Sequence, residues 1–162
     1  MKVEMKTTMG SFTIELFETE APISVANFLR YVDEGFFDGT IFHRVIEDFM
    51  IQCGEMTADM VSKPNHDSIK NEADNGLKND MYTLAMARTS EIDSATSQFF
   101  INAADNAFLD HGTRDFGYAV FGHVVEGTDV VDEIAGVTTH SVAGQKDVPI
   151  QPVLIESVRR AD

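Results

Sequence analysis

Short stretches in which apolar and polar residues alternate recur along the chain, and this two-residue period constrains the fold more than any other feature of the sequence. Val3 and Met5 alternate with polar residues before a break at Gly10, and Phe12 and Ile14 do so after it. Because successive strand residues point to opposite faces, this pattern predicts a β-hairpin with one buried face. Further runs with strand character lie at residues 41–46, 49–53, 83–87, 98–102, 118–125 and 153–158.

Two segments carry a helical period instead. Pro22 opens the first, and Gly35 follows its last apolar residue, where a helix needs a left-handed backbone. The apolar residues between them, spaced i, i+3, i+4 and i+7, are Val25, Phe28, Leu29 and Val32. A second, shorter helix is predicted from Thr128 to Ala135. Many strands with two helices predict a mainly β fold, a barrel or a sandwich with helical end caps.

The chain is expected to form a single domain over residues 1–162, because this length suits one hydrophobic core and no repeat or composition shift divides it. Two irregular connections stand out. Residues 54–80 lack periodicity and are long for a structureless loop, which is typical of a functional segment. Residues 105–117 are rich in turn formers but include Phe108 and Leu109, two apolar side chains that a surface loop does not require.

Charge and cysteine content exclude several classes of partner. The chain has 12 basic and 27 acidic residues, a formal net charge of −15, which repels nucleic acid and anionic membrane surfaces. Its single cysteine, Cys53, cannot form an internal disulfide, and the alternating N-terminal residues do not resemble a signal peptide. A cytoplasmic protein with an unreactive thiol is therefore expected.

The usual catalytic machinery is missing from the sequence. No nucleophile motif, phosphate-binding glycine loop or metal-ligand spacing is found, and no cofactor is expected. His43 lies within a strand-like run and is interpreted as a packed core residue rather than a base, and His111 as a solvated loop residue.

The run at residues 98–102 has two faces of different character. Gln98 and Phe100 share one face, because they lie two residues apart, whereas Phe99 and Ile101 point to the other. Two adjacent apolar side chains indicate a core face. A glutamine amide beside a large apolar ring fits neither a dry core nor an ordinary wet surface.

The neighbouring runs repeat this mixed polarity. Met50 and Gln52 share a strand face, and Arg44 adds a fork of hydrogen-bond donors nearby. Such faces suit a ligand that is itself part apolar and part amide, and a peptide is such a ligand.

Several segments, in order along nearly the whole chain, resemble the signature motifs of the cyclophilin family. They are Phe42–Ile46, Phe49–Gly54, Leu84–Arg88, Ser97–Ile101, Phe108–Asp110 and Val120–Val124, while Asn71–Ala73 and Asn75–Leu77 are similar to the long loop of its bacterial members. The resemblance implies a closed, eight-stranded antiparallel β-barrel with a helix at each end. It also implies peptidyl-prolyl cis/trans isomerase activity without a cofactor, on proline-containing peptides and on unfolded or folded client proteins, by a monomer.

The same resemblance assigns roles to residues. Arg44 matches the catalytic arginine of the family. The residues that match the proline pocket of the family are Phe49, Met50, Phe100 and Leu109. Gln52 and Gln98 match the side chains that hold the substrate backbone, and Ala87 and Arg88 match the segment along which the peptide lies.

Four positions depart from the pattern of many family members. Phe108 stands in place of tryptophan, Tyr118 in place of histidine, Arg88 in place of asparagine, and Cys53 in place of glycine. The pocket stays aromatic, so isomerase activity is still expected. Because a tryptophan N–H favours cyclosporin binding in the family, only weak binding of cyclosporin is expected here.

Two other functions remain as alternatives. A chaperone module of the same fold would grip proline-containing segments with little turnover, and the presence of Arg44 beside an apolar pocket argues against it. A β-barrel carrier for a small apolar ligand would fit the strand pattern, but it leaves Arg44, Gln52 and Gln98 unexplained.

Overall fold

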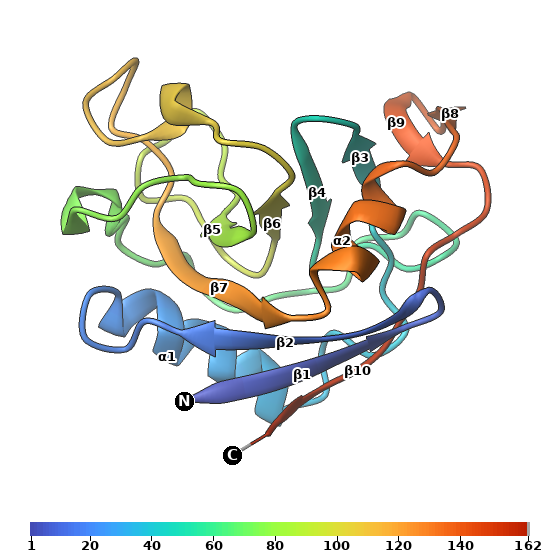
Figure 1. The fold of residues 1–162 in the computed structure, drawn as a ribbon, viewed down its shortest axis with the longest axis horizontal. Helices are drawn as coiled ribbons and strands as arrows, with labels where there is room; N and C mark the ends of the chain where they lie inside the picture. The colour runs from blue at the N-terminus through green and yellow to red at the C-terminus, as the bar shows by residue number, and fades with distance from the viewer. Residues whose placement is uncertain (162) are drawn as a thin grey trace.

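Eight antiparallel strands form one curled sheet in the computed structural model, which describes residues 1–161 (Figure 1). Residue 162, the last of the predicted domain, lies outside the described residues. The order across the sheet is β10-β1-β2-β7-β5-β6-β4-β3. The bounds are β1 Lys2–Thr7, β2 Gly10–Leu16, β3 Arg44–Ile46, β4 Met50–Cys53, β5 Thr83–Met86, β6 Phe99–Asn102, β7 Val120–Glu126 and β10 Ile155–Arg160. Each lies within or close to a run that the sequence predicts to be a strand.

The sheet curls into a barrel that is not fully closed, which corrects the expectation of a closed one. Its edge strands, β10 and β3, do not pair as a ladder. The chain just outside them bridges the gap: an isolated bridge joins Ile41 to Leu154, and the Phe42 amide donates to the Val153 carbonyl at 3.1 Å. The bridged residue Ile41 precedes β3, and the opposite edge bends at residues 150 and 151, next to Pro152, so the contact does not extend into a ladder with β3.

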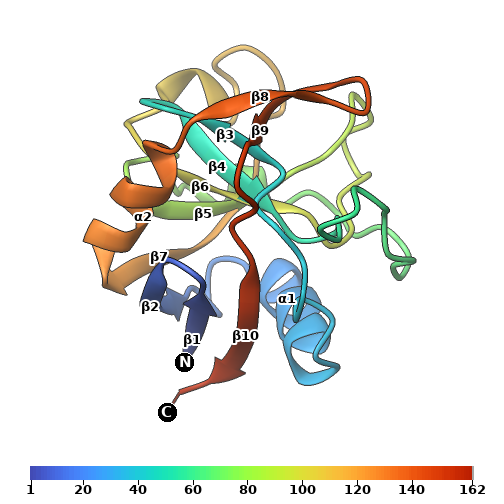
Figure 2. The same ribbon diagram turned by 90° about the vertical axis from the view of Figure 1, so that its right-hand side faces the viewer.

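Two helices pack at opposite ends of the barrel, as the sequence predicts (Figure 2). The helix α1 spans Pro22–Asp33, and Gly35 follows it with a φ of 68°. The helix α2 spans Thr128–Ala135. The buried side chains of both helices join the interior of the barrel. Of the helices in residues 1–161, none is long and apolar enough to cross a membrane.

The sheet has apolar clusters on both of its faces. The interior cluster includes Phe99, Ile101 and Cys53, all fully buried. Burial raises the pKa of the Cys53 thiol well above its ordinary value, in keeping with the unreactive cysteine expected. A second, smaller cluster on the outer face consists of Met50, Ala85, Phe100, Leu109 and Val120. The opposite orientations of Phe99 and Phe100 confirm the two-faced strand.

One β-hairpin was not expected from the sequence. Strands β8 (Thr139–Val142) and β9 (Gln145–Pro149) pair with each other outside the main sheet. Their residues are mostly polar and lack apolar alternation, so the periodicity gives no strand signal. The turn uses Ala143 and Gly144, with φ values of 53° and 78°, as two-residue hairpin turns require.

The long connection at residues 54–80 packs against α1. Its Glu72 carboxylate accepts hydrogen bonds from the backbone amides of Ser24 at 2.7 Å and Ile23 at 3.2 Å. A carboxylate at these otherwise unpaired amides stabilises the start of a helix. Two short 3-10 helices, Ala73–Asn75 and Ala107–Leu109, lie in the irregular connections.

Candidate active site

A row of side chains crosses three adjacent strands on the outer face of the sheet. In register, Arg44 of β3 lies opposite Gln52 of β4, and Gln52 lies opposite Phe100 of β6. Residues paired across antiparallel strands project from the same face. The pairing therefore brings together a guanidinium, an amide and an aromatic ring that are separated by up to 56 positions in the sequence.

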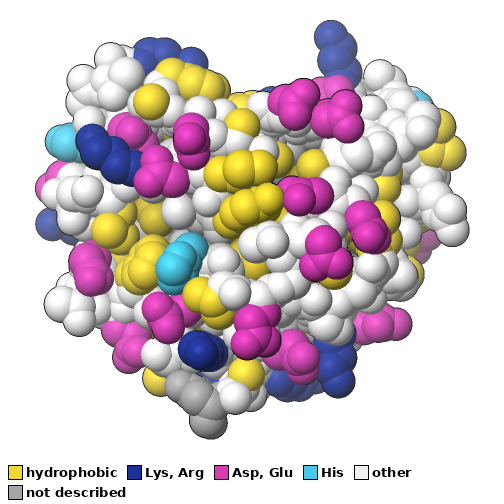
Figure 3. Space-filling model, in the orientation of Figure 1, with side chains coloured by type: hydrophobic (Ala, Val, Ile, Leu, Met, Phe, Trp, Pro, Cys, Tyr) yellow, Lys and Arg dark blue, Asp and Glu magenta, His cyan; other side chains and the backbone are white. Residues whose placement is uncertain are grey.

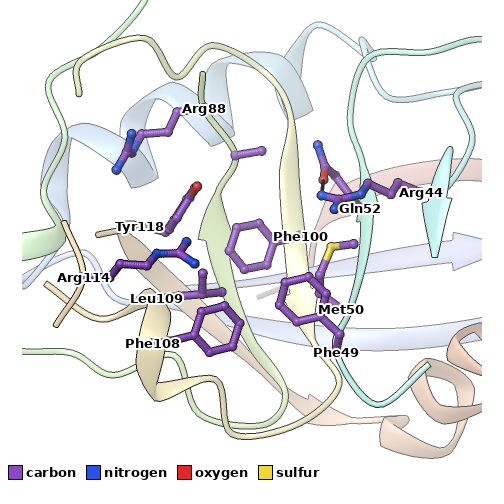
Figure 4. A pocket seen from close by; sticks show the side chains of 11 residues that line it. Arg44, Phe49, Met50, Gln52, Arg88, Phe100, Phe108, Leu109, Arg114 and Tyr118 are labelled. Carbon is purple, nitrogen blue, oxygen red and sulfur yellow. Dashed lines mark hydrogen bonds between the residues drawn. The ribbon is translucent and has the colours of Figure 1, made fainter. Parts of the chain in front are cut away.

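These side chains border a pocket of about 450 Å³ (Figure 4). Its lining consists of Arg44, Phe49, Met50, Gln52, Ala87, Arg88, Phe100, Phe108, Leu109, Arg114 and Tyr118. Ten of the eleven residues assigned to the site from the sequence are among them. Gln98 is not, and Arg114 is an addition.

The floor of the pocket is apolar and buried. Met50, Phe100 and Leu109 are each at most 4% exposed. Phe49 stacks on Phe108 with their ring centroids 5.7 Å apart, and Phe108 is 40% exposed at the rim. A buried apolar floor that is open on one side and flanked by aromatic rings suits a compact apolar group such as a proline ring.

A chain of amides orients the polar side of the pocket. The Gln52 Nε2 donates to Gln98 Oε1 at 2.8 Å, and Gln98 Nε2 donates to Glu55 Oε2 at 3.1 Å. This leaves the Gln52 oxygen facing Arg44, whose Nη1 lies 3.5 Å away. Gln98 therefore lies behind Gln52 as a support and does not line the pocket. Glu55, which completes the chain, had no signal in the sequence.

Arg88 is a structural wall rather than a free cation. Its side chain is only 4% exposed, and its guanidinium lies 4.6 Å from the centroid of the Tyr118 ring. It donates to the carbonyls of Gly117 at 3.1 Å and Thr89 at 2.9 Å, and its Nη2 lies 3.4 Å from Asp115. Arg88 thus fixes the segment that carries Tyr118, whose ring contacts Phe100 edge to face.

A buried polar network holds the loop at residues 105–117 against the sheet. Asn106 donates to the Asn102 side chain and to the Phe49 carbonyl, both at 2.8 Å, and Asn102 donates to Asn79 at 3.1 Å. The backbone amide of Asn79 in turn donates to Asp110 Oδ1 at 2.7 Å. Buried polar groups that are paired in this way give a loop one defined position. The network therefore sets where the loop residues Phe108 and Leu109 meet Phe49.

Arg114 is the pocket residue that sequence reasoning missed. Its guanidinium lies 5.3 Å from the centroid of the Phe108 ring, and its side chain points toward the pocket (Figure 4). It lies in a turn-rich segment without periodicity, so nothing in the local pattern distinguishes it from a solvated surface residue.

His43 lies next to Arg44 in the sequence but is buried, as expected, at 6% exposure. Its Nδ1 has no hydrogen-bond partner within residues 1–161. Burial, with a smaller contribution from the Arg44 charge, lowers the pKa of His43 to about 4, against a side-chain contact with Gln98 that raises it. The imidazole therefore stays neutral at physiological pH.

Acidification is expected to destabilise the protein through His43. The unfolded chain binds a proton near pH 6.5 and the folded chain only near pH 4, so stability is full above pH 6.5 and falls as the pH drops toward 4. The loss amounts to at most about 3 kcal/mol. Urea unfolding at about pH 7 and pH 4 measures it. His43→Asn should lose less stability between these pH values, and an equal loss in both proteins would contradict the assignment.

Comparison with known proteins identifies the family. Residues 2–160 match the family described as "Cyclophilin type peptidyl-prolyl cis-trans isomerase/CLD". The chain is 59% identical over 160 residues to peptidyl-prolyl cis-trans isomerase cyp18 of Streptomyces antibioticus, covering 97% of this chain and 96% of that protein. It is 51% identical over 159 residues to peptidyl-prolyl cis-trans isomerase B of Escherichia coli, covering 96% and 97% respectively.

A solved structure supports the same assignment. The cyclophilin type peptidyl-prolyl cis-trans isomerase of Cryptosporidium parvum, determined in the presence of the dipeptide Ala-Pro, superposes with a TM-score of 0.86 and 25% identity. The match covers 100% of this chain and 99% of that one. Motifs, curled sheet and relatives agree, and the chain belongs to the cyclophilin-type peptidyl-prolyl cis-trans isomerases, enzymes that accelerate rotation about X-Pro peptide bonds.

Proposed function

We propose that Arg44 supplies the catalytic interaction of this isomerase. Rotation about a peptide bond costs roughly 18–20 kcal/mol, because the C–N bond loses its partial double-bond character. As the bond twists, the prolyl nitrogen becomes pyramidal and gains a lone pair that accepts a hydrogen bond. In the planar ground state this nitrogen accepts almost none. A donor placed against it therefore stabilises the transition state selectively.

The observation that carries the proposal is the row Arg44, Gln52 and Phe100. Phe100, with Met50 and Leu109, offers a buried floor for the proline ring, and Arg44 stands beside that floor with its guanidinium exposed. The ring would seat on the floor while the guanidinium donates to the twisting nitrogen. No bond breaks, so the reaction requires no nucleophile or proton relay.

The remaining pocket residues would hold the flanking backbone. Gln52 presents an amide whose orientation is fixed through Gln98, and Ala87 lies at the end of β5, where a peptide can run along the pocket. Holding one side of the X-Pro bond defines which half rotates. Isomerisation of a proline peptide by the purified protein, compared with its Arg44→Ala variant, tests these roles directly.

The substrates that this arrangement suits are proline-containing segments of unfolded or folded client proteins. The Ala-Pro dipeptide named for the Cryptosporidium parvum structure supports recognition of a single X-Pro unit. We propose that the chain acts as one isomerase domain over residues 1–162, as a monomer in the cytoplasm.

Turnover is expected to be nearly independent of pH. Among residues 1–161, the pocket lining contains no His, Cys, Asp or Glu, and the guanidinium group keeps its proton at any ordinary pH. The nearby His43 stays neutral above its pKa of about 4. The value of kcat/KM, measured by NMR exchange, should therefore vary little between about pH 6 and 9. A bell-shaped profile from a fully folded protein would refute the mechanism, because it would require a titrating acid or base.

Cyclosporin is expected to bind weakly. Phe108 is exposed at the rim but has no N–H to donate to this ligand, and the Arg114 guanidinium lies against its ring. Phe108→Trp should tighten binding by roughly fivefold or more, the value of one recovered hydrogen bond. Calorimetric titration of both proteins measures the difference. Tight binding by the unmodified protein would show that the missing donor does not matter.

A further inference from the structure

The arginines of this acidic protein are distributed unevenly. Figure 3 shows acidic side chains spread over one face of the molecule, with fewer basic ones, most of them toward its edges. Of the six arginines in the sequence, four lie within 4.0 Å of a carboxylate. These ion pairs are Arg30 with Glu34, Arg88 with Asp115, Arg159 with Asp38 and Arg160 with Asp33.

The other two, Arg44 and Arg114, have no carboxylate partner among residues 1–161, and both line the pocket. They stand on opposite sides of it (Figure 4). In a chain with a net charge of −15, two unneutralised guanidiniums at one pocket form a local positive site. Arg44 is assigned to the prolyl nitrogen, which leaves the charge of Arg114 without a role.

The loop around Arg114 keeps that guanidinium available. The neighbouring Asp115 is turned away from it, since its carboxylate accepts from the Gly117 amide at 2.7 Å and lies 3.4 Å from Arg88. The Gly112 amide donates to the Asp115 carbonyl at 2.9 Å and closes the turn. Gly117 packs so closely on His111 that an added Cβ would lie 2.7 Å from its backbone nitrogen. The turn is therefore built to present Arg114 over Phe108.

We propose that Arg114 is a specificity-determining residue that favours proline segments carrying a carboxylate side chain within three residues of the proline, on the side away from Arg44. The inference rests on the proposed seating of proline in this pocket. A planar guanidinium pairs with a carboxylate through two parallel hydrogen bonds. An extended peptide advances roughly 3.3–3.6 Å per residue. From a proline against Phe49 and Phe108, one to three residues reach Arg114.

Arg114 would attract the carboxylate of an acidic client locally, whereas the rest of the acidic surface repels it. The net charge repels an acidic peptide wherever its carboxylate lies, so this background is similar for all positions along a short peptide. Attraction by Arg114 depends on position and is confined to one side of the proline. This difference separates the local effect from the overall charge.

The test is a scan of paired peptides. Each contains one proline and has either Glu or Gln at one of the three positions before or after it, and isomerisation is measured by NMR exchange, which needs no coupled protease. At least one position on one side should show a Glu/Gln ratio of kcat/KM of roughly two- to fivefold at low salt, the range of an exposed ion pair. About 0.5 M salt should bring the ratio close to one.

Two substitutions and a matched control locate the effect. Arg114→Gln should lower that ratio to about one or below, whereas Arg114→Lys should keep part of it. Arg30→Gln makes the same change in net charge on α1, outside the pocket, and should leave the ratio unchanged. If all peptides are turned over and the ratio is the same in wild type and Arg114→Gln, the inference is wrong and Arg114 only packs on Phe108. If no peptide is turned over, the proposed function itself fails.

Discussion

Arg44→Ala is expected to lower kcat/KM for a proline peptide by roughly two to three decades. The estimate corresponds to a loss of about 2–4 kcal/mol of transition-state stabilisation, by analogy with removal of one oxyanion-hole donor. The guanidinium is exposed and has only a 3.5 Å contact with Gln52, so its removal leaves the interior cluster intact. Binding of the peptide should weaken much less than turnover, because the floor of Met50, Phe100 and Leu109 remains.

Arg44→Lys separates the geometry of the side chain from its charge. An ammonium on a flexible stem keeps the charge but loses the planar, pre-organised fork, so it should recover little of the lost activity. Exchange NMR gives turnover, peptide titration gives binding, and circular dichroism checks the fold. If Arg44→Ala keeps more than about a third of the normal kcat/KM while folded, the effect is below 1 kcal/mol. The assignment of the catalytic interaction to Arg44 would then be wrong.

Phe100→Ala is expected to damage binding and turnover together. Phe100 is 4% exposed and packs with Met50 and Leu109 in the outer cluster, so its loss removes a wall of the pocket rather than a contact specific to the transition state. The same truncation leaves a cavity in a well-packed cluster and should cost about 3–5 kcal/mol of stability. Peptide titration, kinetics and urea unfolding measure the three effects.

The adjacent residue provides a matched control. Phe99 is also buried but faces the barrel interior, so Phe99→Ala should lower stability by a similar amount and leave kcat/KM of the folded fraction near its normal value. If either alanine variant fails to fold, Phe99→Leu and Phe100→Leu repeat the comparison with a smaller change in volume. Equal losses of activity in the two folded variants would show that Phe100 acts through general packing rather than as pocket wall.

Periodicity within the sequence was enough for most of the fold. Two-residue alternation predicted the opening hairpin, short β-rich runs predicted the other six strands of the sheet to within a few residues, and the helical spacing with Pro22 and Gly35 predicted α1. These signals are local, because the burial of one face of a strand or helix determines which of its neighbouring residues are apolar. The hairpin β8-β9 has no such apolar pattern, because it lies outside the main sheet and few of its side chains are buried.

The candidate site could be predicted as a set of residues but not as an arrangement. Strand geometry predicted that the side chains of Gln52 and Phe100 point away from the interior. The resemblance to the family motifs assigned both residues to one site with Arg44. Neither could tell that Gln98 stands behind Gln52, since that depends on the pairing of β4 with β6 and on the contact of Gln98 with Glu55.

The sequence by itself determined which side chains face inward, which face outward and which family the motifs resemble, because each of these follows from residues close together in the chain. Only the tertiary structure decided the pairings between distant segments. Glu72 pairs with the start of α1 from 48 positions away, and the loop at residues 105–117 brings Arg114 over Phe108. Contacts of this kind depend on how the curled sheet places distant segments beside one another, and no periodicity along the sequence encodes that placement.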